Sequence, residues 1–299
     1  MKIVITGTTG LLGFNLFNFF QSLGYEMYPA QRAERFQVSS NNTLHFDLEK
    51  VDSFFSDLEK IQPKVLIHCA ALTNVDECEK NPENAFKLNS KASEDLADFC
   101  GKNHIRFIFI STDQLWDGSK SFVDEKEIPA PLNVYGKSKM KAESLILDVN
   151  PKSLIIRTNF FGEGLENNKS ILNWCLKSIK NEKSISGFRD VFFTPISIPY
   201  LAFYLDKLLY LDLIGIFHLI GSERVSKLEF LRRIAIAYGY NSNLIKNISV
   251  DDQNLFAPRP KDMSLSVNKI ETVLSCKMPD LNKSILSITN NKINLNECK

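Results

Sequence analysis

The sequence lacks the features that would direct it to a membrane or to nucleic acid. No apolar run reaches the length of about 20 residues that a membrane-spanning helix needs. The N-terminal apolar run, residues 3–5, is too short for the core of a secretory signal peptide. The net charge of +1 over 299 residues gives no electrostatic reason to bind nucleic acid or an anionic surface. We therefore expect a cytoplasmic protein that binds neither nucleic acid nor membrane.

Cysteine and histidine are too scattered to suggest a metal site. The six cysteines form no CxxC pair, and none has a histidine at metal-ligand spacing. We expect no metal, reduced thiols that mostly fill the core, and four histidines with structural roles. Repeats are absent too, and we expect only the Asn/Lys-rich tail after Asn282 to be loosely constrained.

The sequence does contain a regular alternation of strand and helix signals. Strands are expected at residues 2–6, 26–29, 44–48, 64–69, 106–110, 152–157 and 215–220. Helices are expected at residues 12–23, from 51, and at 82–100, 137–147, 173–180, 201–211, 225–238 and 269–274. This alternation predicts an α/β fold with a doubly wound parallel sheet of the Rossmann type. We assign residues 1–158 to a dinucleotide-binding domain, rejoined by about 188–222, and residues 159–299 mainly to a smaller C-terminal α+β substrate lobe.

A glycine-rich loop follows the first expected strand. The segment Gly7-Thr8-Thr9-Gly10-Leu11-Leu12-Gly13 lies between that strand and a helical pattern. Glycines let the backbone approach a pyrophosphate, and a helix N-terminus supplies free N–H donors and partial positive charge. The context favours dinucleotide binding over a tight turn without a ligand.

Basic residues follow the second strand, where NAD-selective sites usually place an acidic side chain on the ribose 2′-hydroxyl. The chain has Arg32 and, further along, Arg35. A guanidinium suits a 2′-phosphate, so the sequence favours NADPH, while the nearby Glu34 keeps NADH open. Asp47, after the third strand, fits either an acceptor for the adenine amino group or a cap for the next helix.

The segment from Ser111 to Lys139 carries the candidate reaction chemistry. Thr112 follows a buried strand, and Tyr135 and Lys139, four residues apart, are expected on one face of a helix. A free phenol has a pKa of about 10. An ammonium beside Tyr135 is expected to lower the pKa of the phenol, and Thr112 would hold a substrate oxygen. The spacing alone is common, and it fits equally a tyrosine packed at the start of a surface helix.

These motifs together resemble the extended short-chain dehydrogenase/reductase superfamily and, within it, the dTDP-4-dehydrorhamnose reductase family. The matching segments span most of the chain and are residues 7–13, 70–79, 111–118, 135–143, 156–160 and 259–265. The resemblance implies that Thr112, Tyr135 and Lys139 form the catalytic set. It also implies NADPH-dependent reduction of the 4-keto group of a nucleotide-linked 4-keto-6-deoxy sugar.

The same resemblance implies the positions of the ligand contacts. The pyrophosphate would lie against Gly7, Gly10, Leu11, Leu12 and Gly13. The adenine would lie between Asp47 and Leu48, the cofactor ribose side against Ala70, Ala71 and Leu72, and the nicotinamide ribose near Tyr135 and Lys139. Asp113 and Phe160 would touch the sugar nucleotide. Arg259, fixed between two prolines, suits a substrate contact or a structural loop equally.

Departures from the wider superfamily narrow the implied chemistry. Dehydratases carry Thr-Asp-Glu, whereas this chain has Gln114 after Thr112-Asp113, and an amide cannot act as the base. The cysteine of the epimerising reductases is absent after Thr112. Residues 188–195 replace the Asp-Gln-x-Gly-x-Pro-Thr segment usual in rhamnose reductases, so another deoxysugar stays open.

Two further functions stay open on the sequence. One is an epimerase or another extended short-chain oxidoreductase that acts on a nucleotide sugar. The second is a non-catalytic regulatory subunit that keeps the dinucleotide-binding fold and resembles that of methionine adenosyltransferase. The complete set of Thr112, Tyr135 and Lys139 argues against the regulatory subunit. The oligomeric state, including a homodimer, is open.

Overall fold

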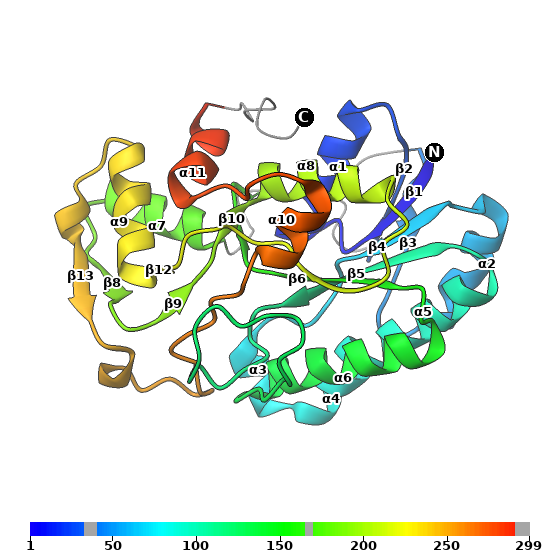
Figure 1. The fold of residues 1–299 in the computed structure, drawn as a ribbon, viewed down its shortest axis with the longest axis horizontal. Coiled ribbons are helices and arrows are strands. Elements are labelled where there is room, and N and C mark those ends of the chain that lie inside the picture. Colours follow the sequence, from blue (N-terminus) through cyan, green and yellow to red (C-terminus); the bar gives the residue numbers. More distant parts are fainter. Residues whose placement is uncertain (33–40, 165–169, 291–299) are drawn as a thin grey trace.

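A seven-stranded sheet organises the computed structural model, which describes residues 1–32, 41–164 and 170–290 (Figure 1). The strand order is β11-β6-β5-β4-β1-β2-β3, and every pair is parallel. The strands are β1 (Lys2–Thr6), β2 (Glu26–Gln31), β3 (Leu44–His45), β4 (Val65–His68), β5 (Arg106–Thr112), β6 (Leu154–Thr158) and β11 (Gly215–His218). The predicted doubly wound sheet is confirmed. Glu34 and Arg35 lie outside the described residues.

The strand order reverses between β1 and β4. From β1 the sheet grows through β2 and β3 on one side, and from β4 through β5, β6 and β11 on the other. The loops that leave β1 and β4 therefore diverge, and in open α/β sheets such a switch point is where ligands bind. The glycine-rich loop leaves β1 here, and residues 69–73 leave β4 beside it.

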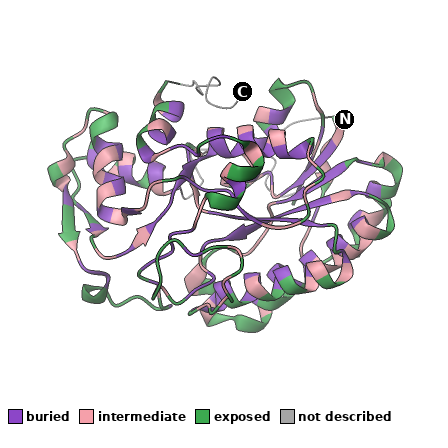
Figure 2. Ribbon diagram, in the orientation of Figure 1, coloured by how far each residue is buried: buried purple, intermediate pink, exposed green. Residues whose placement is uncertain are grey.

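Helices cover both faces of the sheet (Figure 1). One face packs on α1 (Leu11–Ser22), α8 (Ile198–Leu209) and α10 (Asn268–Leu274). The other packs on α2 (Asp52–Ile61), α5 (Ala92–Lys102) and α6 (Val134–Val149). The strands are buried on both faces, while the helices expose their outer sides (Figure 2). This layering explains why the strand sequences are continuously apolar rather than alternating.

The helix expected at residues 82–100 contains a π-helical turn. The chain runs from α3 (Val75–Lys80) through α4 (Pro82–Phe86) and the π-helix η2 (Lys87–Lys91) into α5. In this turn the Asn89 side chain accepts from the Leu72 N–H at 2.7 Å and donates to the Leu72 carbonyl at 3.0 Å. Ser90 donates to the Ser138 carbonyl at 2.7 Å. The widened turn thus joins the loop after β4 to α6, as π-bulges near functional sites often do.

A smaller α+β lobe occupies the left of the view in Figure 1 and has its own core. Its short strands are β7 (Phe160–Phe161), β8 (Ile185–Phe188), β9 (Phe192–Phe193), β10 (Ile196–Ser197), β12 (Val225–Ser226) and β13 (Ile245–Ile248). Its helices are α7 (Ile171–Lys180), α9 (Lys227–Ala237), α11 (Leu281–Thr289) and the 3-10 turns η3 (Ser242–Leu244) and η4 (Val250–Asp252). Phe161 and Phe193 each pack edge-on against Phe230, with centroids 5.0 and 5.3 Å away. The smaller lobe is as predicted, while the boundary at residue 158 stays a prediction.

The expectation of a loose tail after Asn282 is wrong for residues 282–290. Residues 281–289 form α11, whose N-cap Asp280 accepts from the Lys283 N–H at 2.8 Å. Ile285 and Ile288 are buried in the core of the smaller lobe. The serine, asparagine and lysine residues between them hid a short amphipathic helix in the sequence.

The cysteines match their predicted state in part. Cys69, Cys78, Cys100 and Cys175 are free thiols, and burial raises the pKa of Cys78 and Cys175 to about 11. Cys276 is disulfide-bonded, so the expectation of reduced thiols is wrong for this residue. Disulfide pairing depends on spatial proximity that sequence spacing does not reveal.

Within the described ranges, no helix is both long and apolar enough to cross a membrane. The same ranges contain no group of three or more histidine, cysteine or acidic side chains placed to hold a metal ion.

We expect Ile285→Ala to lower the free energy of unfolding by about 2 to 5 kcal/mol, because it leaves a cavity in a packed core. Urea unfolding followed by circular dichroism measures the change. The matched control is Leu286→Ala on the same helix, since Leu286 is 53% exposed and Ile285 only 3%. The control should change the free energy by less than about 0.5 kcal/mol. Equal, small effects of both substitutions would show that α11 does not contribute to the core.

Candidate active site

A cavity of about 1000 Å³ lies at the switch point of the sheet. Fifteen of the predicted site residues line it: Gly7, Gly10, Leu11, Leu12, Gly13, Arg32, Asp47, Leu48, Ala70, Ala71, Leu72, Thr112, Asp113, Tyr135 and Phe160. Two predicted residues, Lys139 and Arg259, are not among its lining residues. Segments from both halves of the sheet and from the smaller lobe therefore meet at one cavity.

The glycine loop is shaped by close backbone contacts. Gly7 has a φ of +75°, and a Cβ there would lie 2.8 Å from the Ala70 nitrogen. A Cβ on Gly13 would lie 2.4 Å from the Gly7 carbonyl oxygen. The first turn of α1 contains no acidic residue, and its N-cap, Gly10, makes no side-chain capping bond. The backbone of the glycine loop and the positive end of the α1 dipole therefore face the cavity. This arrangement suits a pyrophosphate.

Arg32, Asp47 and Leu48 line the same cavity. The Asp47 carboxylate accepts from the Glu49 N–H at 3.1 Å and so shapes the turn after β3. It does not cap α2, whose N-cap residue is Val51. Of the two roles open for Asp47 in the sequence, the helix cap is therefore excluded, and the adenine contact stays a prediction.

The start of α6 is fixed by two polar contacts and one close approach. Asn133 accepts from the Gly136 N–H at 2.9 Å, and Glu79 accepts from the Val134 N–H at 2.9 Å. A Cβ on Gly136 would lie 2.2 Å from the Gln114 carbonyl oxygen. Because α6 begins so close to the residues that follow β5, Tyr135 reaches the Thr112 hydroxyl.

The pKa of Tyr135 is raised well above its usual value, which corrects the expectation of a lowered pKa. Burial is the largest cause, and the Asp113 carboxylate adds to it. The Thr112 hydroxyl, in hydrogen-bonding reach of the phenol, opposes this shift. Lys139 does not act on Tyr135 here, because its ammonium donates to the Ile110 carbonyl at 2.8 Å. In this structure Tyr135 is therefore a protonated phenol at neutral pH.

Lys139 lies behind the wall of the cavity. Its ammonium is 3.8 Å from the centroid of the Phe109 ring. Burial lowers the pKa of Lys139 to about 7, and the Glu143 carboxylate opposes the change. Glu143, one helical turn further along α6, also pairs with the buried Arg157 at 2.6 Å. Tyr135, Lys139 and Glu143 therefore share the buried face of α6, as the spacing of the first two predicts.

Arg259 lies on a loop in the C-terminal part of the chain, and this loop contacts the first turn of α3. Its guanidinium contacts the Asp76 carboxylate at 2.9 Å and the Ala257 carbonyl at 3.1 Å. The neighbouring Pro258 carbonyl accepts from the Asn133 side chain at 3.1 Å. The loop thus braces the N-terminus of α6, and a direct contact of Arg259 with substrate stays a prediction.

Several lining residues were not singled out from the sequence. Asn159 lines the cavity after β6 and donates to the Asp113 carboxylate. Gln114, which the sequence marked only as a departure from the dehydratases, lines it too, and its N–H donates to the Thr112 hydroxyl at 3.2 Å. Asn159 lies two residues after the strand expected at residues 152–157 and directly before the predicted contact Phe160. This position was the signal available in the sequence.

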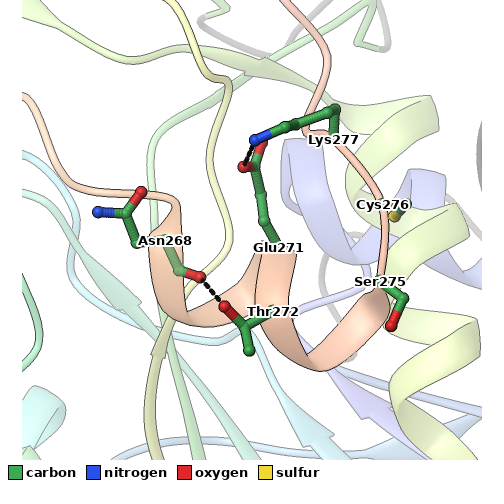
Figure 3. Close-up of a pocket in the computed structure, with 6 residues that line it drawn as sticks. All are labelled: Asn268, Glu271, Thr272, Ser275, Cys276 and Lys277. Carbon is green, nitrogen blue, oxygen red and sulfur yellow. Dashed lines mark hydrogen bonds and ion pairs between the residues drawn. The ribbon is translucent and has the colours of Figure 1, made fainter.

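A second hollow, beside α10, lacks comparable chemistry (Figure 3). Lys277 pairs with Glu271 at 2.7 Å, and the Thr272 hydroxyl donates to the Asn268 carbonyl at 2.8 Å. The charged side chains of this second hollow therefore pair with each other. The cavity at the switch point of the sheet is the candidate active site.

We expect Tyr135 to stay protonated up to pH 10, because burial and Asp113 both disfavour the phenolate. Ultraviolet difference titration of the wild type against Tyr135→Phe isolates this phenol from the other tyrosines. A single ionisation between pH 7 and 9 in the difference spectrum would contradict the structure and restore the lowered pKa expected from the Tyr-x-x-x-Lys spacing. A fluorescence check of folding at each pH is the control.

Comparison with known proteins identifies the family. The dTDP-4-dehydrorhamnose reductase of Aggregatibacter actinomycetemcomitans is 29% identical over 96% of this chain and 98% of that protein. The methionine adenosyltransferase 2 subunit beta of Rattus norvegicus is 30% identical over 91% of this chain and 82% of that protein. The NADP complex of dTDP-4-dehydrorhamnose reductase from Bacillus anthracis superimposes with a TM-score of 0.87 at 25% identity, covering 97% of this chain and 99% of that one.

A model of the family described as RmlD substrate binding domain matches residues 1–293. This match agrees with the resemblance seen in the motifs and with the relatives above. The chain therefore belongs to the RmlD substrate binding domain family of the extended short-chain dehydrogenases/reductases.

Proposed function

We propose that the protein reduces the 4-keto group of a nucleotide-linked 4-keto-6-deoxy sugar, with NADPH as the preferred donor and NADH as an alternative. The observation that carries the proposal is the shared cavity. The Thr112 and Tyr135 hydroxyls line the same space as the glycine loop. A dinucleotide held at the loop would thus extend toward two hydroxyls suited to a carbonyl oxygen.

The proposed chemistry follows from the protonation state of the two hydroxyls. When bound, NADPH supplies the hydride to the carbonyl carbon. Tyr135, whose raised pKa keeps the phenol protonated, donates its proton to the oxygen as negative charge develops there. Thr112 donates a hydrogen bond to the same oxygen and stabilises that charge. The resemblance assigns Lys139 to the nicotinamide ribose hydroxyls, and its amine would have to leave the Ile110 carbonyl to reach them.

Gln114 supports reduction over dehydration. Its side-chain carbonyl accepts from Asn133 at 3.3 Å, and an amide cannot remove a proton from a sugar carbon. The names of two relatives, dTDP-4-dehydrorhamnose reductase from Aggregatibacter actinomycetemcomitans and from Bacillus anthracis, support the same assignment. The proposal includes a cytoplasmic location, a role in deoxysugar and cell-surface polysaccharide synthesis, and a homodimer as the oligomeric state to be tested.

A regulatory subunit is the second candidate, because the rat relative is named methionine adenosyltransferase 2 subunit beta. Against it is the presence of all three predicted catalytic residues, Thr112, Tyr135 and Lys139. A regulatory protein would turn over no nucleotide sugar and would copurify with a partner enzyme. An epimerase would need no added NADPH.

The test is NADPH oxidation by the purified protein with a panel of dTDP-, UDP- and GDP-linked 4-keto-6-deoxy sugars. We expect stoichiometric NADPH consumption with at least one of them. Oxidation of NADPH with none of the panel would contradict the proposal, and interconversion of sugars without net consumption would favour the epimerase.

Tyr135→Phe should lower turnover by about 100-fold or more, the usual size of a lost general acid, without changing the dissociation constant of NADPH. Initial rates and a fluorescence titration of the cofactor measure the two quantities. Tyr210→Phe is the matched control, because Tyr210 is 70% exposed and does not line the cavity. Turnover near the wild-type rate in Tyr135→Phe would exclude the assigned proton donor.

Arg32→Ala should weaken NADPH binding by about 10-fold or more, since a charge-assisted hydrogen bond contributes about 1.5 to 3 kcal/mol. NADH binding should change by less than about 2-fold, because NADH has no 2′-phosphate. Titration of both cofactors into both proteins gives the comparison. Arg189→Ala, an exposed arginine that does not line the cavity, is the control. Equal losses for the two cofactors would remove Arg32 from the 2′-phosphate site.

A further inference from the structure

Thr158 ends strand β6 with a buried hydroxyl that lacks a hydrogen-bond partner within the described ranges. The residue is 3% exposed. Its Oγ1 finds neither a donor nor an acceptor among the residues that the structure describes. A buried hydroxyl left unpaired costs free energy, so native structures keep few such groups and usually have a reason for each. The hydroxyl of Thr158 is thus available to a partner from outside the chain.

The position of Thr158 points to a ligand rather than to imperfect packing. Five buried side-chain atoms lack a partner in the described part of the chain, and they belong to Trp116, Ser153, Thr158, His218 and Ser284. Thr158 is the one of these residues that lines the cavity at the switch point. A bound molecule can satisfy an unpaired polar group beside a cavity, whereas a group sealed in the core stays unpaired.

Thr158 lies beside the candidate catalytic hydroxyl. In the parallel pair of β5 and β6, Thr112 and Thr158 are register partners. Neighbouring parallel strands lie about 4.8 Å apart, and residues in register point to the same side of the sheet. Both residues line the same cavity. A ligand group that reaches the Thr112 hydroxyl is therefore also close to Thr158.

The donors next to Thr158 already have a partner. The Thr112 hydroxyl donates to the Asp113 carboxylate at 3.3 Å. The Asn159 side-chain amide donates to the same carboxylate. The Thr158 hydroxyl thus keeps its proton for another acceptor. A carbonyl oxygen of a ligand suits it, because such an oxygen accepts a hydrogen bond and has no proton of its own to donate.

The order of the lining segments indicates which carbonyl this is. The segments run from Arg32, which follows β2, past the glycine loop after β1 and the loop after β4, to the ends of β5 and β6. A dinucleotide with its pyrophosphate at the glycine loop extends one half towards Arg32 and the other half towards β6. The last group of that second half is the nicotinamide carboxamide, whose carbonyl oxygen is an acceptor.

We propose that the Thr158 hydroxyl donates a hydrogen bond to the carboxamide oxygen of the nicotinamide ring and so fixes the rotation of that ring in the cavity. This inference rests on the proposed function, which places a nicotinamide dinucleotide in this cavity, and deepens it. A ring fixed in this way presents one face to a ketone held at Thr112. The contact is equally open to NADPH and NADH, because both carry the carboxamide.

The test compares the wild type with Thr158→Val, which replaces the hydroxyl by a methyl group of similar size. Titration calorimetry measures the dissociation constants of NADPH, NADH and adenosine 2′,5′-bisphosphate, which lacks the nicotinamide half. We expect Thr158→Val to weaken the binding of NADPH and of NADH by about 3- to 10-fold, the usual size of one lost hydrogen bond. The affinity for the bisphosphate should stay unchanged.

Thermal unfolding without any ligand gives a readout that separates a ligand contact from a structural role. Thr158→Val removes a buried unpaired group, so the melting temperature should rise by about 2 to 4 °C. A hydroxyl that supported the fold would instead lower the melting temperature when it is removed. A more stable fold together with weaker NADPH binding is therefore the signature of a ligand contact.

Two further variants serve as controls. Thr158→Ser keeps the hydroxyl and should bind NADPH within about 2-fold of the wild type. Ser153→Ala removes another buried hydroxyl that is unpaired in the described part of the chain, on the residue that precedes β6. It should leave the affinity for NADPH unchanged, because Ser153 does not line the cavity.

Unchanged NADPH affinity in Thr158→Val would overturn the inference, as would an equal loss for the bisphosphate, a lowered melting temperature, or a Thr158→Ser variant that binds as weakly as Thr158→Val. A higher KM for the sugar without a loss of NADPH affinity would overturn it too, since the hydroxyl would then contact the sugar. The binding measurements need no sugar. If no sugar of the panel is reduced, the proposed function fails, while the comparison of NADPH with the bisphosphate still decides the Thr158 contact.

Discussion

The close approach between Gly136 and the Gln114 carbonyl governs the geometry of the candidate site. A Cβ at Gly136 would lie 2.2 Å from that oxygen, so only glycine lets α6 begin this near to the end of β5. The Asn133 and Glu79 side chains then hold the first N–H groups of the helix. Thr112 and Tyr135 meet because two backbones touch, and their hydroxyls are positioned before any ligand arrives.

Burial of charge is the second constraint, and it sets the protonation states. Tyr135, Lys139 and Asp113 each have a pKa displaced toward the neutral form, with burial as the largest cause. Each displacement is opposed by a partner: the Thr112 hydroxyl, the Glu143 carboxylate and the Lys227 ammonium respectively. Two of these partners lie in the large domain, and Lys227 comes from the smaller lobe. The smaller lobe also contributes Phe160 of β7 to the lining of the cavity.

The sequence predicted the sheet, the glycine loop and most of the cavity lining, because these depend on local apolar runs and on short motifs. Gly7 and Gly13 were recognisable for this reason. The direction of the Tyr135 pKa shift was wrong, since spacing places Lys139 on the right helix face but does not show that its ammonium is directed at Ile110. Asn159 was missed because its side chain reaches Asp113 through tertiary packing. The buried face of α11 was hidden by its polar residues.

The central claim is that this cavity transfers hydride to a sugar ketone while Tyr135 supplies the proton. Isotope transfer from deuterated NADPH tests it most directly, using the sugar that supports NADPH consumption and mass spectrometry of the product. The account predicts one deuterium per product molecule, bonded to the C4 carbon, from one face of the nicotinamide. Products without deuterium, or deuterium that returns to the cofactor during interconversion of two sugars, would contradict it.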